Sequence, residues 1–406
     1  MTRKGLVLIF VFIFILAGFA QLTFGLINVG NDDMRLVNTG YGVSYGFDAH
    51  PSFHSNGSRF FYFATHSGIR YVNSANGETR WPEAFSITRP HMAARGDVVA
   101  VGDIDRGRTI HVYDPDGLMY TVSLDHPTLG FSVNSTGYLS VIVQRDAGYG
   151  IYVYNRRYSF EPLFSQAVYA DRPMQFPVAA EVSDDGRFVA IAFLDLSLNL
   201  TTEIEFRVIN PWDAPWGTES LFAKESFPDE AFLGMRFMAD NHVLLVTDHR
   251  ITLKRIIGND VQEQWTEVLH NRLDQLAFCG NNRFAVVAGA PLSPDGRDAD
   301  PLGTVSMFDM SGLTGRFYLG RRATHLSMGH NALIVGADRY FHAVNARGES
   351  MWHHVATHDV RDMIFLDNTD TVLIAGPNRA YVWRRQRGRD AQPSTLENLE
   401  LEDEVY

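Results

Sequence analysis

Apolar residues along this chain fall into short runs that recur in a fixed order, with polar residues between them. From Phe53 to Arg387 one unit appears eight times: an apolar strand, a polar turn, a second strand, and a third strand that mostly ends in Asp or Asn. A strand-rich unit that recurs roughly every 40 to 55 residues is typical of a β-propeller. The turns that follow the first strands are Asn56-Gly57, Arg95-Gly96, Thr136-Gly137, Asp185-Gly186, Asp240-Asn241, Asn281-Asn282, His330-Asn331 and Asn368-Thr369.

The composition of each strand indicates its place in a blade. Second strands such as Arg187 to Phe193 are nearly continuous apolar runs, which suits strands covered on both faces. Third strands such as Thr109 to Tyr113 alternate apolar and polar residues, as strands nearer the rim do. The Asx residue that follows six of them can accept a hydrogen bond from the backbone two residues on and so begin a turn. We predict an all-β, eight-bladed β-propeller of four-stranded antiparallel blades, or seven blades if the degenerate fifth unit is misread.

The eighth unit has only three strands, from Asp362 to about Arg384. We expect residues 34–38 to supply its missing outer strand, which would close the ring without a long open edge. The predicted organisation is therefore a linker and ring-closing strand at 28–50, the propeller at 51–388, and a flexible acidic tail at 389–406.

The N-terminus, residues 1–27, has the pattern of a membrane anchor. Gly5 to Ile27 are uncharged and mainly apolar, and Arg3 and Lys4 precede them. As a helix this stretch would measure roughly 34 Å, enough to cross a bilayer. A cleaved signal peptide usually has a shorter apolar region. We favour an uncleaved transmembrane helix with the propeller on the extracytoplasmic side of the cell membrane; cleavage would make the protein secreted.

Charge and cysteine content narrow the function classes. The net charge of −12 argues against nucleic-acid binding, which needs a clustered basic surface. Cys279 is the only cysteine, so the chain forms no internal disulfide.

Two units resemble the tryptophan-docking pattern of quinoprotein-like (PQQ-like) propellers. Trp81 and Trp352 each lie four residues after a glycine, Gly77 and Gly348. Other units resemble WD40-like propellers, with Tyr-Asp or Phe-Asp in place of Trp-Asp. The resemblance implies that Trp81 and Trp352 pack against neighbouring blades. Its superfamily includes an eight-bladed, non-enzymatic propeller lipoprotein of outer-membrane protein assembly, and the layout also resembles membrane-anchored bacterial propellers of uncharacterised function.

The same resemblance raises the question of a quinone cofactor. Quinoprotein alcohol dehydrogenases bind pyrroloquinoline quinone with calcium, and many have adjacent cysteines near it. A single Cys279 excludes that subtype. We therefore expect no cofactor and assign no metal site and no catalytic residues.

Candidate partner-binding residues lie in two loops. Trp212 and Trp216 occur in a Pro-rich loop, and tryptophan is frequent in interface hot spots. Asp295, Asp298 and Asp300 occur in a second loop and suggest a Ca²⁺ site, but they lack the later bidentate Glu of an EF-hand. The stretches 194–203 and 290–303 read as insertions after second strands, and they emerge on one face of a propeller, which becomes our candidate binding surface.

These features favour a membrane-anchored protein-interaction or envelope-assembly scaffold. The alternatives are a ligand-sensing or carbohydrate-binding propeller and, third, a hydrolase or lyase with its site at the channel mouth. A scaffold should lack a channel cluster of side chains with shifted pKa values. A sensor should have a deep aromatic pocket, and an enzyme should have converging His, Asp, Glu or Arg side chains.

Overall fold

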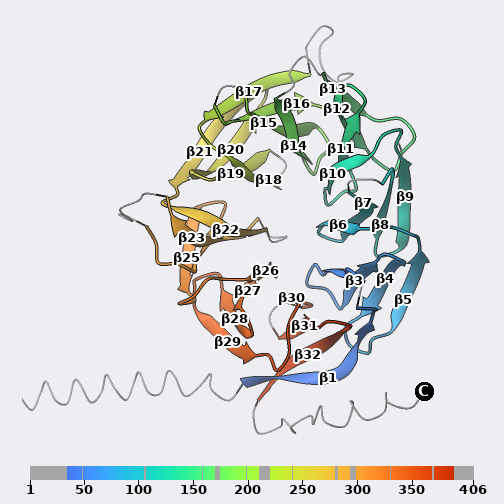
Figure 1. The fold of residues 1–406 in the computed structure, drawn as a ribbon, viewed down its shortest axis with the longest axis vertical. Coiled ribbons are helices and arrows are strands. Elements are labelled where there is room, and N and C mark those ends of the chain that lie inside the picture. The colour runs from blue at the N-terminus through green and yellow to red at the C-terminus, as the bar shows by residue number, and fades with distance from the viewer. Residues whose placement is uncertain are drawn as a thin grey trace, which may run out of the picture.

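Eight four-stranded antiparallel sheets follow one another around a ring (Figure 1). This computed structural model describes residues 34–47, 49–104, 107–157, 159–169, 174–197, 199–209, 220–239, 241–278, 282–292, 299–329, 331–367 and 370–387. The prediction of an eight-bladed propeller with four antiparallel strands per blade is confirmed. The predicted membrane anchor lies outside the described residues. Across the described ranges, no helix has the length and apolar character needed to cross a bilayer.

Each blade places its strands in chain order from the channel to the rim. The inner strands are β2 (Ser52–His54), β6 (Pro90–Arg95), β10 (Thr128–Val133), β14 (Gln175–Val182), β18 (Phe232–Ala239), β22 (Asn271–Phe278), β26 (His325–Met328) and β30 (Asp362–Phe365). The second strands are β3 (Phe60–Thr65), β7 (Val98–Asp103), β11 (Leu139–Arg145), β15 (Phe188–Asp195), β19 (His242–Thr247), β23 (Phe284–Pro291), β27 (Ala332–Ala337) and β31 (Thr371–Ala375).

The third strands are β4 (Gly68–Asn73), β8 (Thr109–Asp114), β12 (Gly148–Tyr154), β16 (Thr201–Val208), β20 (Arg250–Ile257), β24 (Thr304–Asp309), β28 (Tyr340–Asn345) and β32 (Arg379–Arg387). The outer strands are β5 (Thr79–Ala84), β9 (Gly117–Ser123), β13 (Phe164–Tyr169), β17 (Leu221–Pro228), β21 (Asp260–Val268), β25 (Gly312–Tyr318), β29 (Ser350–Val355) and, in blade eight, β1 (Met34–Ser44).

Two faces of the ring follow from this strand order. The connections from second to third strands and from one blade to the next emerge on one face, which we call the linker face. The turns from first to second and from third to fourth strands emerge on the opposite face, which we call the turn face.

The Asx turns at the ends of the third strands form as predicted. The Asn73 and Asp114 side chains accept hydrogen bonds from the backbone N–H two residues on, at 2.9 and 2.8 Å. Asn155, Asp309 and Asn345 make the same contact. The sixth residue of this set, Asn210, lies outside the described residues.

One of the two expected insertions is shorter as a loop than the sequence suggests. In blade four, Leu194 pairs with Thr202 and Asp195 with Thr201, so half of the stretch 194–203 extends the hairpin. In blade six, β23 ends at Pro291 and β24 begins at Thr304, so residues 292–303 connect the two strands, close to the expected 290–303. The predicted loop is therefore too long in blade four, because residues at both of its ends pair as strand.

The ring closes through the N-terminal strand. β1 runs antiparallel to β32 from the pair Met34–Arg387 to the pair Ser44–Arg379, with a bulge between Asn38 and Gly42. The strand is thus longer than the expected 34–38. Val43 packs in the cluster that joins blades eight and one, while Leu36 packs against the cluster between blades seven and eight.

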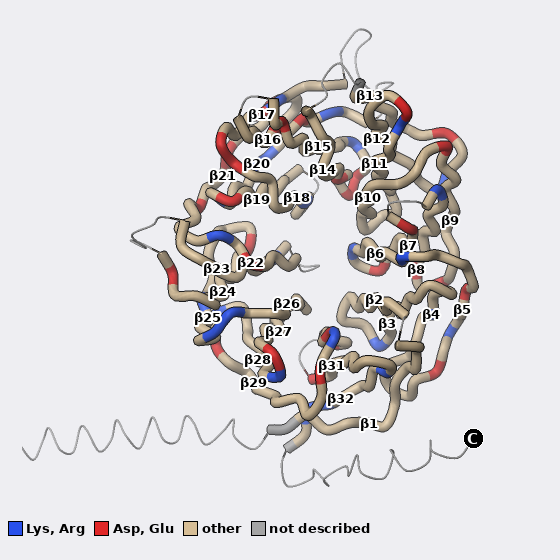
Figure 2. The backbone as a smooth tube through the Cα atoms, in the orientation of Figure 1, with Lys and Arg blue, Asp and Glu red and all other residues tan. Residues whose placement is uncertain are grey.

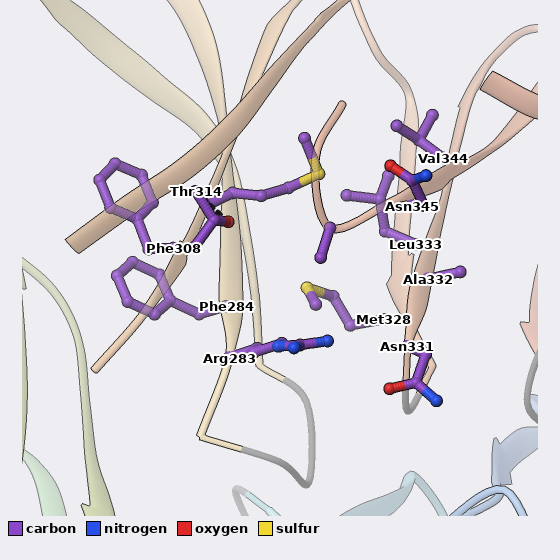
Figure 3. Close-up of a pocket in the computed structure, with 12 residues that line it drawn as sticks. Arg283, Phe284, Phe308, Thr314, Met328, Asn331, Ala332, Leu333, Val344 and Asn345 are labelled. Atoms are coloured by element: carbon purple, nitrogen blue, oxygen red, sulfur yellow. Dashed lines mark hydrogen bonds between the residues drawn. The ribbon is translucent and has the colours of Figure 1, made fainter. Parts of the chain in front are cut away.

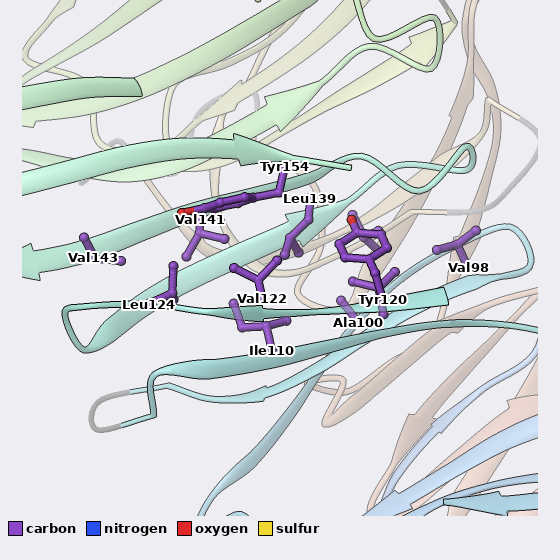
Figure 4. Close-up of a cluster of buried hydrophobic side chains, with 12 residues drawn as sticks. Val98, Ala100, Ile110, Tyr120, Val122, Leu124, Leu139, Val141, Val143 and Tyr154 are labelled. Carbon is purple, nitrogen blue, oxygen red and sulfur yellow. The ribbon is translucent and has the colours of Figure 1, made fainter. Parts of the chain in front are cut away.

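The hydrophobic core lies in the seams between blades. In one seam, Val98, Ile110 and Val122 of blade two pack against Leu139 and Val141 of blade three (Figure 4). Each second strand is buried on both faces, which explains its continuous apolar run.

Aromatic side chains of the outer strands fill several seams. Trp81 stacks on Tyr113 of blade two, with ring centroids 5.7 Å apart, and its indole N–H donates to the Pro115 carbonyl at 3.0 Å. Trp352 is buried and meets Phe365 of blade eight edge-on at 6.1 Å.

Two further residues contact the next blade in the same way and were not predicted from the sequence. Trp265 stacks on Phe308 of blade six, and its indole N–H donates to the Met310 carbonyl at 3.0 Å. The Tyr120 hydroxyl donates to the Gly137 carbonyl of blade three at 2.8 Å. Like Trp81 and Trp352, both residues directly follow the β-bulge of their outer strand. This position identifies the residues that fill a seam better than their spacing from a glycine does.

Blade six carries Gly315 at this position, opposite Met307. A Cβ atom on Gly315 would overlap the backbone of Arg347 in blade seven, so this seam closes by direct backbone approach. The cavity that remains beside Thr314 and Val344 measures about 10 Å³ (Figure 3). That volume is about one water molecule and is too small for a ligand.

Ring closure depends on the absence of a side chain at Gly42, where a Cβ atom would overlap the Ala380 carbonyl oxygen of β32. We expect Gly42→Val to lower the free energy of unfolding by about 1–3 kcal/mol, the usual cost of overpacking, measured by urea denaturation. Gly46→Ala is the matched control, because a Cβ atom there meets nothing within 4 Å. Equal stability of the two variants would contradict the role of Gly42.

Candidate functional site at the ring channel

The inner strands of blades three to six share a β-bulge at one position. The register shifts place Leu129, Val178, Leu233 and Asp274 at these bulges, each eight residues before the second residue of the turn that follows. Bulges redirect side chains and are frequent beside functional sites. The three aliphatic residues remain 38–42% exposed, which places an apolar arc on the channel side of three consecutive blades.

Closer to the turn face, polar side chains replace this apolar arc. Ser132, Glu181 and Arg236 occupy equivalent positions in blades three, four and five, each five residues before the second turn residue. The Ser132 hydroxyl donates to Glu181 Oε1 at 2.7 Å. The Arg236 guanidinium lies over the Phe278 ring, 5.2 Å from its centroid. We call these three residues, together with Arg95, Asp184 and His54, the channel cluster.

Arg95 connects blades that are not neighbours. Arg95 is the last residue of β6 in blade two. Its Nη2 donates to Asp184 Oδ2 of blade four at 3.0 Å and to the Phe237 carbonyl of blade five. Asp184 in turn accepts the Ser135 backbone N–H at 3.2 Å. The Arg95 side chain is only 8% exposed, and its Nη1 has no hydrogen-bond partner among the described residues.

Burial raises the pKa of Glu181 above its usual range. The Ser132 hydrogen bond and the guanidinium groups of Arg236 and Arg95 act in the opposite direction, and Asp184 adds to the increase. Burial lowers the pKa of His54, whose Nε2 lies 2.9 Å from the Gly96 carbonyl, and Arg236 lowers it further. Neutral forms of both groups are thus favoured in the folded protein.

The chemistry available to the described part of this cluster is limited. The Ser132 hydroxyl donates its hydrogen bond to Glu181, and the Nε2 of His54 contacts a backbone carbonyl, so the described residues form no serine–histidine nucleophile pair here. Within the described ranges, no three His, Cys, Asp or Glu side chains gather as a metal site. The described contacts of this cluster join polar side chains from several blades and leave Arg95 Nη1 available to a hydrogen-bond acceptor.

Of the residues proposed for partner binding, only Asp300 is described. Its backbone N–H donates to Asn271 Oδ1 at 2.8 Å, and Asn271 Nδ2 donates to the Asp300 carbonyl at 3.0 Å. Buried Asn271 therefore anchors the base of the blade-six loop, a role that sequence reasoning missed. The Asp300 carboxylate is 36% exposed and lies 3.8 Å from Arg316. Trp212, Trp216, Asp295 and Asp298 lie outside the described residues.

Comparison with known proteins identifies the family. Residues 60–382 match a family of unknown function, DUF5711. The chain belongs to this family. No curated protein matches it.

Solved structures with the same fold include WD40 propellers. The C-terminal WD40 domain of Sif2 superposes with a TM-score of 0.55 at 12% identity, over 86% of this chain and 98% of that chain. Sqt1 of Saccharomyces cerevisiae gives 0.52 at 13% identity, over 86% and 97%. BamB from Moraxella catarrhalis gives 0.49 at 14% identity, over 86% and 100%. Similarity at these identities shows a propeller fold and nothing more specific.

Arg95→Met should destabilise the protein, because it leaves Asp184 and the Phe237 carbonyl without their cross-channel partner. We expect a loss of about 3 kcal/mol in the free energy of unfolding, measured by urea denaturation. Arg80→Met is the control, since Arg80 pairs with Asp116 at the surface, where side-chain exposures of 47% and 88% make a loss of about 0–1 kcal/mol the expectation. Similar losses for the two variants would refute the structural role of Arg95.

Glu181→Gln tests the raised pKa of this carboxyl group. A raised folded-state pKa means that the folded protein keeps the proton to higher pH than the unfolded chain does, so stability falls as pH rises through this interval. Gln cannot ionise and retains an oxygen that can accept from Ser132. The Tm of the variant minus that of the wild type should become more positive from about pH 4.5 to pH 8. A difference that stays flat across this pH range would contradict the assignment.

Proposed function

We propose that this protein is a membrane-anchored, extracytoplasmic propeller that binds protein partners through its linker face. The observation that carries the proposal is the distribution of exposed apolar side chains. Exposed apolar surface that is grouped on one side of a protein often marks an interaction site. Most of the large exposed apolar residues in the described ranges lie at or beside the linker face: Phe47, Leu129, Met174, Leu196, Leu233, Val268, Leu302, Tyr318, Tyr340 and Val355.

The turn face differs in this respect. Its exposed large apolar residues among those described are Leu118, Phe160, Ile257 and Leu313, in separate hairpins. On the linker face, by contrast, Tyr340 of blade seven is covered by the Arg321 guanidinium at 4.6 Å, and Tyr318 lies at the end of the preceding outer strand. Tyr and Arg are the residue types that most often dominate binding energy at interfaces.

Charge supports a protein partner over a polyanion. Positive and negative positions are interspersed around the ring (Figure 2), and the net charge is −12. A nucleic-acid site would need a continuous basic surface.

The membrane location rests on the apolar stretch from Gly5 to Ile27 and on the two cations before it. A stretch of this length is long enough to span a bilayer, and flanking cations favour the cytoplasmic side.

Ligand binding in the channel is the second candidate function. The channel cluster contradicts the simplest scaffold expectation, since Glu181 and His54 both have shifted pKa values. The Arg95 Nη1 donor that lacks a described partner specifically favours a ligand with a hydrogen-bond acceptor. Within the cluster Ser132 donates to Glu181 and Arg95 to Asp184, so these groups already have partners, and we rank partner binding on the linker face first.

In-cell photo-crosslinking can separate the two faces. A photoreactive amino acid placed at Tyr318 or Tyr340 should give crosslinked partner bands that are identified by mass spectrometry. The same probe at Leu118 or Leu313 on the turn face is the matched control and should give far fewer. Partners that crosslink only from the turn face would overturn the proposed surface. A folded protein with no crosslinks at either face would shift the assignment to ligand binding in the channel.

A further inference from the structure

We propose that the turn-face corner of blade eight lies against an anionic lipid bilayer, so that the linker face is directed away from the membrane. This inference rests on the membrane anchor in the proposed function and adds an orientation and a lipid contact to it. Three observations support it: the place where the anchor joins the fold, the direction of β1, and the arginines beside that junction.

The junction lies at one end of blade eight. β1 begins at Met34, which pairs with Arg387 at the last position of β32. The predicted membrane stretch ends at Ile27, so only residues 28–33 separate it from the sheet. Fully extended, a connection of this length reaches at most about 20–25 Å. An anchor that spans the bilayer would therefore keep this corner of the ring close to the lipid headgroups.

The direction of β1 then orients the propeller. The strand runs from the turn face at Met34 to the linker face at Ser44, where it pairs with Arg379. Its 11 residues correspond to about 35 Å of strand. Because the strand is fixed in the closing sheet over most of this length, a bilayer near Met34 lies far from the linker-face end of the same blade.

Four arginines, at positions 35, 384, 385 and 387, belong to the two strands that pair at this corner. Arg384 is exposed and pairs with Val37, while Arg35 and Arg387 belong to the same two paired strands. Arg385 is mostly buried, donates to the Met351 carbonyl at 3.3 Å and lies 3.7 Å from Asp370. Each basic residue near an anionic membrane surface strengthens the association about five-fold. An anionic headgroup is thus the partner that this corner fits.

The test uses the full-length protein with Cys279→Ser, so that one new cysteine can carry a donor dye. Glu349→Cys places the dye in the β28–β29 turn on the turn face, and Asn378→Cys places it in the β31–β32 turn on the linker face. Both native residues are exposed. The protein is reconstituted into vesicles of phosphatidylcholine, with or without phosphatidylglycerol, that contain an acceptor dye on a lipid headgroup.

We expect stronger energy transfer from position 349 than from position 378, and a larger difference when phosphatidylglycerol is present. Arg384→Gln should remove the increase in this energy-transfer difference that phosphatidylglycerol causes. Arg339→Gln, which removes the same charge at the linker face, should not. Circular dichroism of each variant checks that the propeller remains folded.

Two negative results have different meanings. A protein that floats with the vesicles but shows equal transfer at both positions, or stronger transfer at 378, overturns the orientation and leaves the anchor intact. A full-length protein that does not float with either kind of vesicle overturns the anchor in the proposed function, and this inference with it.

Discussion

Each sheet of this protein must bury both faces against its neighbours, and the rest of the structure depends on this constraint. Second strands such as β15 and β27 are buried along most of their length, so a blade at a free end would expose an apolar surface. The pairing of β1 with β32 removes that free end. It joins residues about 340 positions apart, which makes closure a long-range contact that completes the core only when the whole ring has formed. Ring closure is therefore a condition for stability, and the glycine at position 42 permits it.

The seams show how one fold tolerates unequal repeats. Trp81 and Trp265 each stack on the aromatic residue before an Asp and donate to the carbonyl just after that Asp. Tyr120 uses a hydroxyl for a similar contact. At the same position Gly315 lets the next blade approach by its backbone instead. The seam can thus be filled by a large side chain or closed by backbone contact, because both solutions bring the two blades into close packing.

The repeat, the blade count and the Asx turns could be predicted because each is set by residues near one another in sequence, such as Asn73 and the N–H of residue 75. The channel cluster could not. Arg95 meets Asp184 and Phe237 across 89 and 142 residues, and that meeting depends on the curvature of the ring. Trp265 was not predicted because its longer hairpin changes the spacing from glycine. Its pairing position opposite Leu253 is nevertheless equivalent to that of Trp81 opposite Tyr71. The bulges at Leu129, Val178 and Leu233 leave no local sequence signal that we recognise.

The two ends of the channel therefore differ in chemical character. Near the turn face, Arg95 links blades two, four and five, and Ser132 of blade three donates to Glu181 of blade four. Near the linker face, the bulges leave aliphatic side chains exposed, and Tyr318 and Tyr340 lie at the linker-face ends of their strands. The hydrogen-bonded turn-face end and the apolar linker-face end agree with the proposed scaffold, which is anchored on the turn-face side and binds partners on the linker-face side. The position of β1 agrees with this polarity, since the chain joins the ring at the turn face. Ring closure and the proposed direction of binding thus both depend on how β1 is paired in blade eight.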